Sequence, residues 1–295
     1  MQPTHHNPRK QFDEAVQYAI QITQVYLDQL TKRSIAVDTL EYLEIGPGTD
    51  FAPQLVLAGL GARVTLADQY LAGWDADYHP SFYNSFLGKW SGPGTDAVKA
   101  VLDKGGYEGV VRLVAEPAER MTSLTPDSFD FVQSNAVLEH VVDLQATIAE
   151  LARVTRTGGI HAHQIDFRFH RNFDRPLDHL LMDSESYTKF RLEDRGNHGT
   201  TIRMPEMIEL FTPYFWLWET EINTVSTLEY AQEIWKKLPP DSRYRSWRPQ
   251  VLSAVSGRLW LMRKDDHLRN GTGKIPQKPN RGFWPWRPKN RDCRE

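Results

Sequence analysis

Tyr42-Leu43-Glu44-Ile45-Gly46-Pro47-Gly48-Thr49-Asp50 is the stretch that decides the fold. The apolar run that ends at Ile45 predicts a buried parallel strand, and Gly46 and Gly48 allow the backbone to turn tightly and to approach a ligand closely. A second apolar run, from Ala62 to Ala67, predicts another strand. It ends on Asp68, whose carboxylate can accept hydrogen bonds from both hydroxyls of a ribose. Together the two segments predict a βαβ unit that binds a nucleoside.

The residues after the second glycine indicate which nucleoside is bound. A pyrophosphate-binding turn has the pattern G-x-G-x-x-G, and this chain has Phe51 at the third glycine position. The carboxylate of Asp50 would also repel a pyrophosphate. Both residues are compatible with S-adenosylmethionine (SAM), which has no phosphate and carries a sulfonium cation. Glu44 fits the same ligand, because a carboxylate can hold the methionine ammonium group directly or through water.

Three motifs carry a resemblance to a known family. Glu44–Thr49 resembles motif I of the class I SAM-dependent methyltransferases, with Asp50 in place of the usual third glycine. Ser128–Val141, with the sequence SFDFVQSNAVLEHV, is similar to the fourth-strand signature of the small-molecule group often called type 11. Glu150–Gly159 is similar to the helix and Gly-Gly turn that lead into the fifth strand. The resemblance covers about residues 39 to 165.

This resemblance implies a fold and a cofactor. The expected fold is α/β, with a Rossmann-like, mostly parallel seven-stranded sheet, an antiparallel last strand and helices on both faces. The expected cofactor is SAM, held by Glu44, Gly46, Gly48 and Asp68. The acidic residue after the third strand, expected at 110–114, commonly faces the adenine amino group in this family. The pair Ala118-Glu119 matches that pattern best, and Glu116 is the competing residue.

The ends of the fourth and fifth predicted strands carry further polar side chains. Ser134 and Asn135 follow the strand expected at 129–133, and ligands of open α/β sheets bind at such carboxyl ends. In the fifth strand, His161 and His163 share one face because side chains alternate. Either one could be a general base, a metal ligand or a structural histidine. We rank His163 first as the base, followed by Asp166 or His170, which lie where the chain leaves the strand.

The sequence favours no metal site. Some methyltransferases with a Glu-x-x-Glu-His sequence bind a divalent ion through both glutamates, that histidine and a further one. This chain has Ala136 in place of the first glutamate. Glu139, His140 and a fifth-strand histidine would form an incomplete site. The simpler role for Glu139 and His140 is to cap and brace the helix that follows.

Composition and patterning limit the remaining possibilities. The chain has 295 residues, a formal net charge of −3 and one cysteine, Cys293, so nucleic-acid binding and a disulfide framework are not expected. The segment Met1 to Gln11 is polar, and no apolar run approaches the length of a membrane span. The sequence therefore predicts a cytoplasmic protein and makes no prediction of oligomeric state.

We expect one methyltransferase domain over residues 1–267 and a basic, disordered tail over 268–295 that is suited to contact an acidic partner or surface. An amphipathic helix is expected at 12–30, and two paired strands at 215–222 and 257–263. The aromatic segment 69–94 is either a substrate lid or a packed connection. The arginine-rich segment 167–205 is suited to recognise an anionic or sugar-linked acceptor.

The predicted function is transfer of a methyl group from SAM to an oxygen or nitrogen of a small-molecule acceptor. The first alternative is a nicotinamide-dependent oxidoreductase, which shares the ribose-binding carboxylate. The second is a SAM-binding scaffold without catalysis. Phe51 and Asp50 argue against the oxidoreductase, and acceptor-side bases argue against the scaffold.

Overall fold

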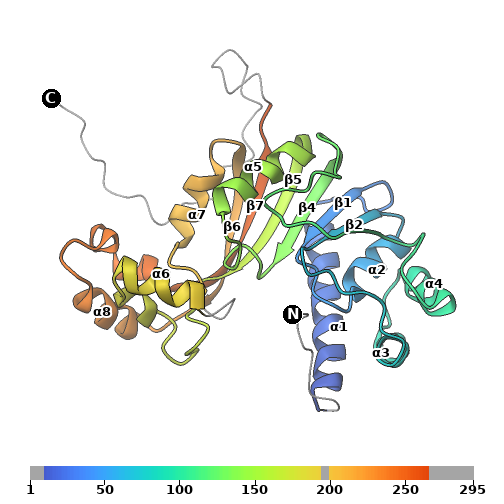
Figure 1. Cartoon of the computed structure of the whole chain (residues 1–295), viewed down its shortest axis with the longest axis horizontal. Coiled ribbons are helices and arrows are strands. Elements are labelled where there is room, and N and C mark those ends of the chain that lie inside the picture. The colour runs from blue at the N-terminus through green and yellow to red at the C-terminus, as the bar shows by residue number, and fades with distance from the viewer. Residues whose placement is uncertain (1–9, 194–198, 266–295) are drawn as a thin grey trace. The chain divides into compact units, whose positions relative to one another are not determined.

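The computed structural model describes residues 10–193 and 199–265, and the expected tail lies outside this part of the chain. Seven strands form a sheet with the order β3-β2-β1-β4-β5-β7-β6 (Figure 1). The strands are β1 Glu41–Ile45, β2 Arg63–Ala67, β3 Arg112–Val114, β4 Phe129–Asn135, β5 Thr155–Asp166, β6 Phe215–Val225 and β7 Ala254–Arg263.

The register of the sheet confirms the predicted fold class. β1 pairs in parallel with β2 on one side and with β4 on the other, and β2 pairs in parallel with β3. β6 and β7 pair antiparallel, as expected for the last part of the sheet. The strand order reverses at β1, because β1 lies between β2 and β4. Ligands of open α/β sheets bind at the carboxyl ends of the strands at such a reversal.

The described chain divides into two compact units, which we treat separately. Of the described residues, unit 1 contains 10–135 and 143–160, and unit 2 contains 136–142, 161–193 and 199–265. The division falls within β5, whose first half belongs to unit 1 and whose second half belongs to unit 2.

Unit 1 contains β1 to β4 and five helices: α1 Lys10–Lys32, α2 Ala52–Gly59, α3 His79–Lys89, α4 Asp96–Lys104 and α5 Leu144–Val154. The long helix α1 confirms the helix predicted at 12–30, and it packs against α2 and α3 (Figure 1). In the core, the rings of Tyr42 on β1 and Phe131 on β4 stack with centroids 5.8 Å apart.

The aromatic segment 69–94 packs against unit 1. Phe82, Tyr83 and Phe86 on α3 are fully buried, and Trp90 stacks on Phe86. Burying three aromatic side chains contributes several kcal/mol of hydrophobic stabilisation. The helix of this segment is therefore a packed part of unit 1, and a role of the segment as a substrate lid stays a prediction.

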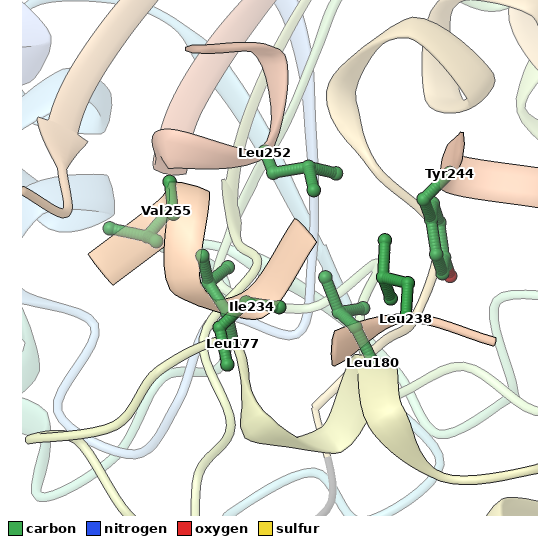
Figure 2. Close-up of a cluster of buried hydrophobic side chains, with 8 residues drawn as sticks. Leu177, Leu180, Ile234, Leu238, Tyr244, Leu252 and Val255 are labelled. Carbon is green, nitrogen blue, oxygen red and sulfur yellow. The ribbon is translucent and has the colours of Figure 1, made fainter. Parts of the chain in front are cut away.

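Unit 2 contains a small core of its own. Its helices are η1 Asp178–Leu181, α6 Ser184–Glu193, α7 Met204–Phe211, α8 Leu228–Lys237, η2 Arg243–Ser246 and α9 Pro249–Ser253. Apolar side chains from η1, α8, η2, α9 and β7 come together in one buried cluster (Figure 2). Its members are Leu177, Leu180, Ala231, Ile234, Leu238, Tyr244, Leu252 and Val255.

Arg203, directly before α7, is a structural residue of unit 2. It is fully buried, and its guanidinium donates hydrogen bonds to the carbonyl oxygens of Phe167 (2.6 Å), Leu252 (3.2 Å) and Ala254 (2.6 Å). One side chain thus ties the end of β5 to the beginning of β7.

Two local sequence interpretations were wrong. Glu139 and His140 lie in a turn, because Asp143 caps α5 by accepting a hydrogen bond from the amide of Ala146. The expected Gly-Gly turn is absent, and β5 runs continuously from Thr155 with Gly158 at a φ of 79°. A glycine tolerates this conformation within a strand as a local irregularity.

No helix within the described ranges is long and apolar enough to cross a membrane.

Candidate functional site

The glycine turn after β1 has the conformation that the sequence predicted. Gly46 and Gly48 have φ values of 62° and 75°, a region that side chains disfavour. The amide of Gly46 donates to the carbonyl of Ala67 at 2.9 Å, which joins the end of β1 to the end of β2. A Cβ added to Gly48 would meet no atom within 4 Å. This face of the turn is therefore not covered by the described protein.

Asp68 lies beside this turn. Ile45 and Ala67 are register partners, so Gly46 and Asp68 leave neighbouring strands at the same level. The Oδ1 atom of Asp68 accepts a hydrogen bond from the amide of Tyr70 at 2.7 Å. This bond orients the carboxylate, and a carboxylate retains acceptor capacity for further donors such as ribose hydroxyls.

Glu44 is buried and bonded to two tyrosines. Its Oε1 accepts from the hydroxyl of Tyr26 at 2.8 Å, and its Oε2 accepts from the hydroxyl of Tyr42 at 2.5 Å. Burial raises the pKa of this carboxyl group, although the hydrogen bonds from its partners oppose the shift. Only 1% of Glu44 is exposed. The contact of Glu44 with the ammonium group of SAM stays a prediction. The structure gives Glu44 a second role, because its hydrogen bond with Tyr26 holds α1 against β1.

Helix α1 reaches the ends of two strands. Tyr26 bonds Glu44 on β1, and the hydroxyl of Tyr18 accepts from the side-chain amide of Asn135 at the end of β4 at 3.0 Å. Ser134, which was predicted to line the site, is 1% exposed. The side of the sheet where a ligand is expected is therefore bordered by α1.

Two residues that support the glycine turn were not recognised from the sequence. The Nδ1 atom of His79 accepts from the amide of Asp75 at 2.7 Å, so its Nε2 carries the proton and donates to the carbonyl of Thr49 at 3.2 Å. The hydroxyl of Tyr83 donates to the carbonyl of Asp50. Burial lowers the pKa of His79, which keeps this neutral tautomer. The aromatic segment therefore supports the glycine turn through hydrogen bonds to the carbonyl oxygens of Thr49 and Asp50. In the sequence, the only indication of this role was the high content of aromatic residues in the segment.

The residues after β3 separate into two roles. Both oxygens of Glu116 accept hydrogen bonds within its own loop, from Thr122 and Ser123. Glu119 accepts from the amide of Asp143 at 3.3 Å, and Ala118 beside it is partly exposed. Both glutamates are thus hydrogen-bonded within unit 1, and the expectation that the pair Ala118-Glu119 faces an adenine stays a prediction.

His161 and His163 in unit 2 share a face, as their alternation predicted, and that face is buried. Both side chains are 0% exposed, and their rings are joined by a hydrogen bond of 3.0 Å between Nδ1 of His161 and Nε2 of His163. The His163 ring stacks on Phe211, and His161 packs against Phe215. Burial lowers the pKa of His163 to about 3 and that of His161 well below its ordinary value. These surroundings are those of a structural pair.

Asp166 and His170 are more accessible than His163. Burial alone would raise the pKa of Asp166, but a bidentate pair with Arg168 outweighs it and holds the pKa below the usual range. The Nε2 atom of His170 lies 3.6 Å from an oxygen of Asp166. The Arg168 guanidinium also lies over the ring of Phe173, 4.4 Å from its centroid.

Glu139 and His140 lie next to this group. The Oε1 atom of Glu139 accepts from the amide of Asp166 at 3.1 Å. The rings of His140 and His170 approach each other with centroids 4.9 Å apart. Burial raises the pKa of Glu139 to about 8. All of these residues belong to unit 2.

Comparisons with known proteins agree with the second and third of the quoted motifs, since Glu44–Thr49 lies outside the matched range. Residues 93–162 match the family model described as a methyltransferase domain. No curated protein matches the chain in sequence.

Solved structures give low-identity similarities. A candidate sarcosine dimethylglycine methyltransferase from Galdieria sulphuraria is 12% identical, with 88% of this chain and 91% of that chain covered and a TM-score of 0.47. A SAM-dependent methyltransferase from Mesorhizobium loti is 14% identical, with 77% and 93% covered and a TM-score of 0.43.

A third similar structure contains ligands. It is a geranyl diphosphate C-methyltransferase from Streptomyces coelicolor A3(2), in complex with Mg²⁺, geranyl-S-thiolodiphosphate and S-adenosyl-L-homocysteine. It is 12% identical, with 77% and 70% covered and a TM-score of 0.44. The strand order of this chain and the family match over residues 93–162 confirm the predicted resemblance to the class I SAM-dependent methyltransferases.

Proposed function

We propose that this protein transfers a methyl group from SAM to an oxygen or nitrogen of a small-molecule acceptor. The observation that carries the proposal is the glycine turn after β1, which is uncovered at Gly48 and lies level with Asp68 on the neighbouring strand. The turn leaves room for a ligand, and the carboxylate can accept from ribose hydroxyls. When bound, SAM would supply an electrophilic methyl group, with S-adenosylhomocysteine as the leaving group.

The residues of the proposed cofactor site fit a nucleoside without phosphates. The N-terminus of α2 begins after Phe51, which is 1% exposed and has a φ of 49°. A bulky residue in that conformation, next to the carboxylate of Asp50, replaces the small, uncharged surface that receives a pyrophosphate. This supports SAM over a nicotinamide dinucleotide.

The acceptor must lose a proton if it is a hydroxyl, and the chain offers three residues for that step. His163 is fully buried beside His161 and Phe211, so we rank it last. Asp166 is bound by Arg168, which makes its carboxylate a weaker base. His170 therefore ranks first among the three candidate bases. Since the sulfonium is already electrophilic, most of the rate would come from positioning the two reactants.

The structure does not favour an anionic or sugar-linked acceptor over others. Arg168 binds Asp166, and Arg203 is buried against backbone carbonyls. Arg175 binds Asp178 and Glu233. Because these three arginines of segment 167–205 are engaged within unit 2, we define the acceptor by its nucleophilic atom and leave its charge open.

Titration calorimetry with SAM, S-adenosylhomocysteine and NAD tests the proposal. We expect both SAM-type ligands to bind and NAD to show no heat of binding at the same concentrations. Tighter binding of NAD would instead support the oxidoreductase. Binding of SAM without any formation of S-adenosylhomocysteine, across phenol, carboxylate and amine acceptors, would support the scaffold.

A further inference from the structure

Glu139, His140 and His170 form a cluster of metal-ligating groups in unit 2. One potential ligand atom of each lies within 4.8 Å of those of the other two. Ligand atoms bound to one first-row metal ion at about 2.0 to 2.2 Å lie roughly 3 to 3.5 Å from each other. Small side-chain rotations would therefore bring the three groups onto one ion.

The carboxylate of Glu139 supplies a second, independent observation. The side chain is buried, with 2% exposed, and its Oε1 atom accepts from the amide of Asp166. Its Oε2 atom has no hydrogen-bond partner among the described residues. A buried carboxylate oxygen without a donor is costly unless a cation compensates it. The guanidinium of Arg168 does not supply that charge directly, since it is paired with Asp166.

We propose that Glu139, His140 and His170 bind one divalent transition-metal ion. Two imidazoles and one carboxylate form a ligand set that suits Zn²⁺, Co²⁺, Mn²⁺ or Fe²⁺ better than Mg²⁺ or Ca²⁺, which prefer oxygen ligands. Three protein ligands also leave at least one coordination position open, which is typical of catalytic metal sites and not of structural ones.

This site differs from the incomplete one that the sequence suggested. The sequence offered a fifth-strand histidine as the third group, but His161 and His163 bind each other in the core of unit 2. His170, beyond the end of β5, is the histidine that lies with Glu139 and His140. Ala136, where related motifs have a glutamate, has an exposed side chain without donor atoms, and His170 completes a three-ligand set without it.

The ion would also define how His170 acts. The open position is suited to an acceptor hydroxyl, whose pKa falls when its oxygen binds a metal ion. That role rests on the proposed methyl transfer, whereas binding of the ion does not. With an ion bound, His170 would be a metal ligand and would take no proton itself; the proton of the metal-bound hydroxyl would pass to solvent water.

The test uses the full chain after treatment with chelator and dialysis, without SAM or acceptor. Calorimetry with Zn²⁺ and absorption spectra with Co²⁺ should give one ion per chain, with Zn²⁺ bound at least 100-fold more tightly than Mg²⁺. Glu139→Gln and His170→Asn should each weaken Zn²⁺ binding at least tenfold. The control is the double variant His5→Asn/His6→Asn, which removes two histidines that are adjacent in the sequence and are not part of the proposed site. It should still bind one ion per chain.

Two results would overturn the proposal. One is unchanged Zn²⁺ affinity in folded Glu139→Gln and His170→Asn, with folding checked by circular dichroism. The other is loss of the bound ion in the His5/His6 double variant. If Glu139→Gln does not fold, His170→Asn alone tests the proposal. The side chain of His170 is 12% exposed and is therefore better placed to tolerate a substitution than the buried Glu139. Calorimetry with SAM on the same preparations tests the proposed function separately from the metal.

Discussion

At the scale of single residues, Gly48 offers the sharpest test of the cofactor site. An added Cβ would meet no protein atom within 4 Å, so a substitution interferes only with the backbone conformation and with a ligand. We expect Gly48→Ala to lower SAM affinity at least tenfold. The strain of a positive φ should also cost about 1 kcal/mol of stability.

Gly105→Ala is the matched control for this prediction. Gly105 also has a positive φ, 64°, and open space around its missing Cβ, but it ends α4. It should lose a similar amount of stability and keep its SAM affinity. Calorimetry and denaturant unfolding measure both quantities, and equal affinities in the two variants would remove the glycine turn from the cofactor site.

Asp68 provides a second prediction at this scale. Its Oδ1 atom is held by the amide of Tyr70, so the carboxylate is oriented before a ligand arrives. A hydrogen bond to a charged group contributes about 1.5 to 3 kcal/mol. Asp68→Ala should therefore weaken SAM binding by at least tenfold, measured by calorimetry. A folded variant with wild-type affinity would show that the ribose is held elsewhere.

Single residues also show how far the sequence could go. Alternation correctly placed His161 and His163 on one face, but it could not tell that this face is the core, because Phe211 and Phe215 come from elements about fifty residues away in the chain. Glycine turns and strand ends depend on local geometry, so the turn at Gly46 and Gly48 and the position of Asp68 at the end of β2 were predictable. The supporting role of His79 depends on a tertiary contact with Thr49 and was not.

At the scale of elements, Arg203 connects three segments of unit 2. Its buried guanidinium donates to the carbonyls of Phe167, Leu252 and Ala254. We expect Arg203→Met to lower the free energy of unfolding by about 3 to 5 kcal/mol, because three buried carbonyl groups lose their donors. Denaturant unfolding followed by circular dichroism measures the loss.

Arg245 is the matched control for Arg203. It donates to the carbonyls of Lys236, Leu238 and Pro239 but is only half-buried, so water can replace its hydrogen bonds. Arg245→Met should cost about 1 kcal/mol or less. A similar loss in the two variants would mean that burial does not set the strength of the Arg203 contacts.

The elements themselves were largely predictable. The helix over 12–30 and the paired strands near 215–222 and 257–263 were found because each is long and strongly patterned. Two glycines in a row predicted a turn at 158–159, yet the strand continues through them. A local pattern does not report how a strand pairs within a sheet, so the glycine pair alone could not predict this outcome.

At the scale of the whole molecule, buried neutral histidines make stability depend on pH. Burial lowers the pKa of both His163 and His179 to about 3, and an unfolded histidine has a pKa of about 6.5. Below about pH 6.5 the unfolded chain therefore takes up protons that the folded chain does not. Stability should fall as pH decreases from about 6.5 toward 3, by up to about 1.4 kcal/mol per pH unit for each such histidine.

His163→Phe tests this dependence because its ring can still pack against Phe211. We expect the loss of unfolding free energy between pH 7.0 and pH 5.5 to be smaller in this variant than in the wild type, by about 1 to 2 kcal/mol. Phe211→Leu is the control, since it disturbs the same packing without removing a titrating group, and it should keep the wild-type pH dependence. If both variants change the pH dependence equally, packing and not protonation explains the effect. If neither does, His163 is protonated in the folded chain as readily as in the unfolded one, and the base role that its burial argues against becomes open again.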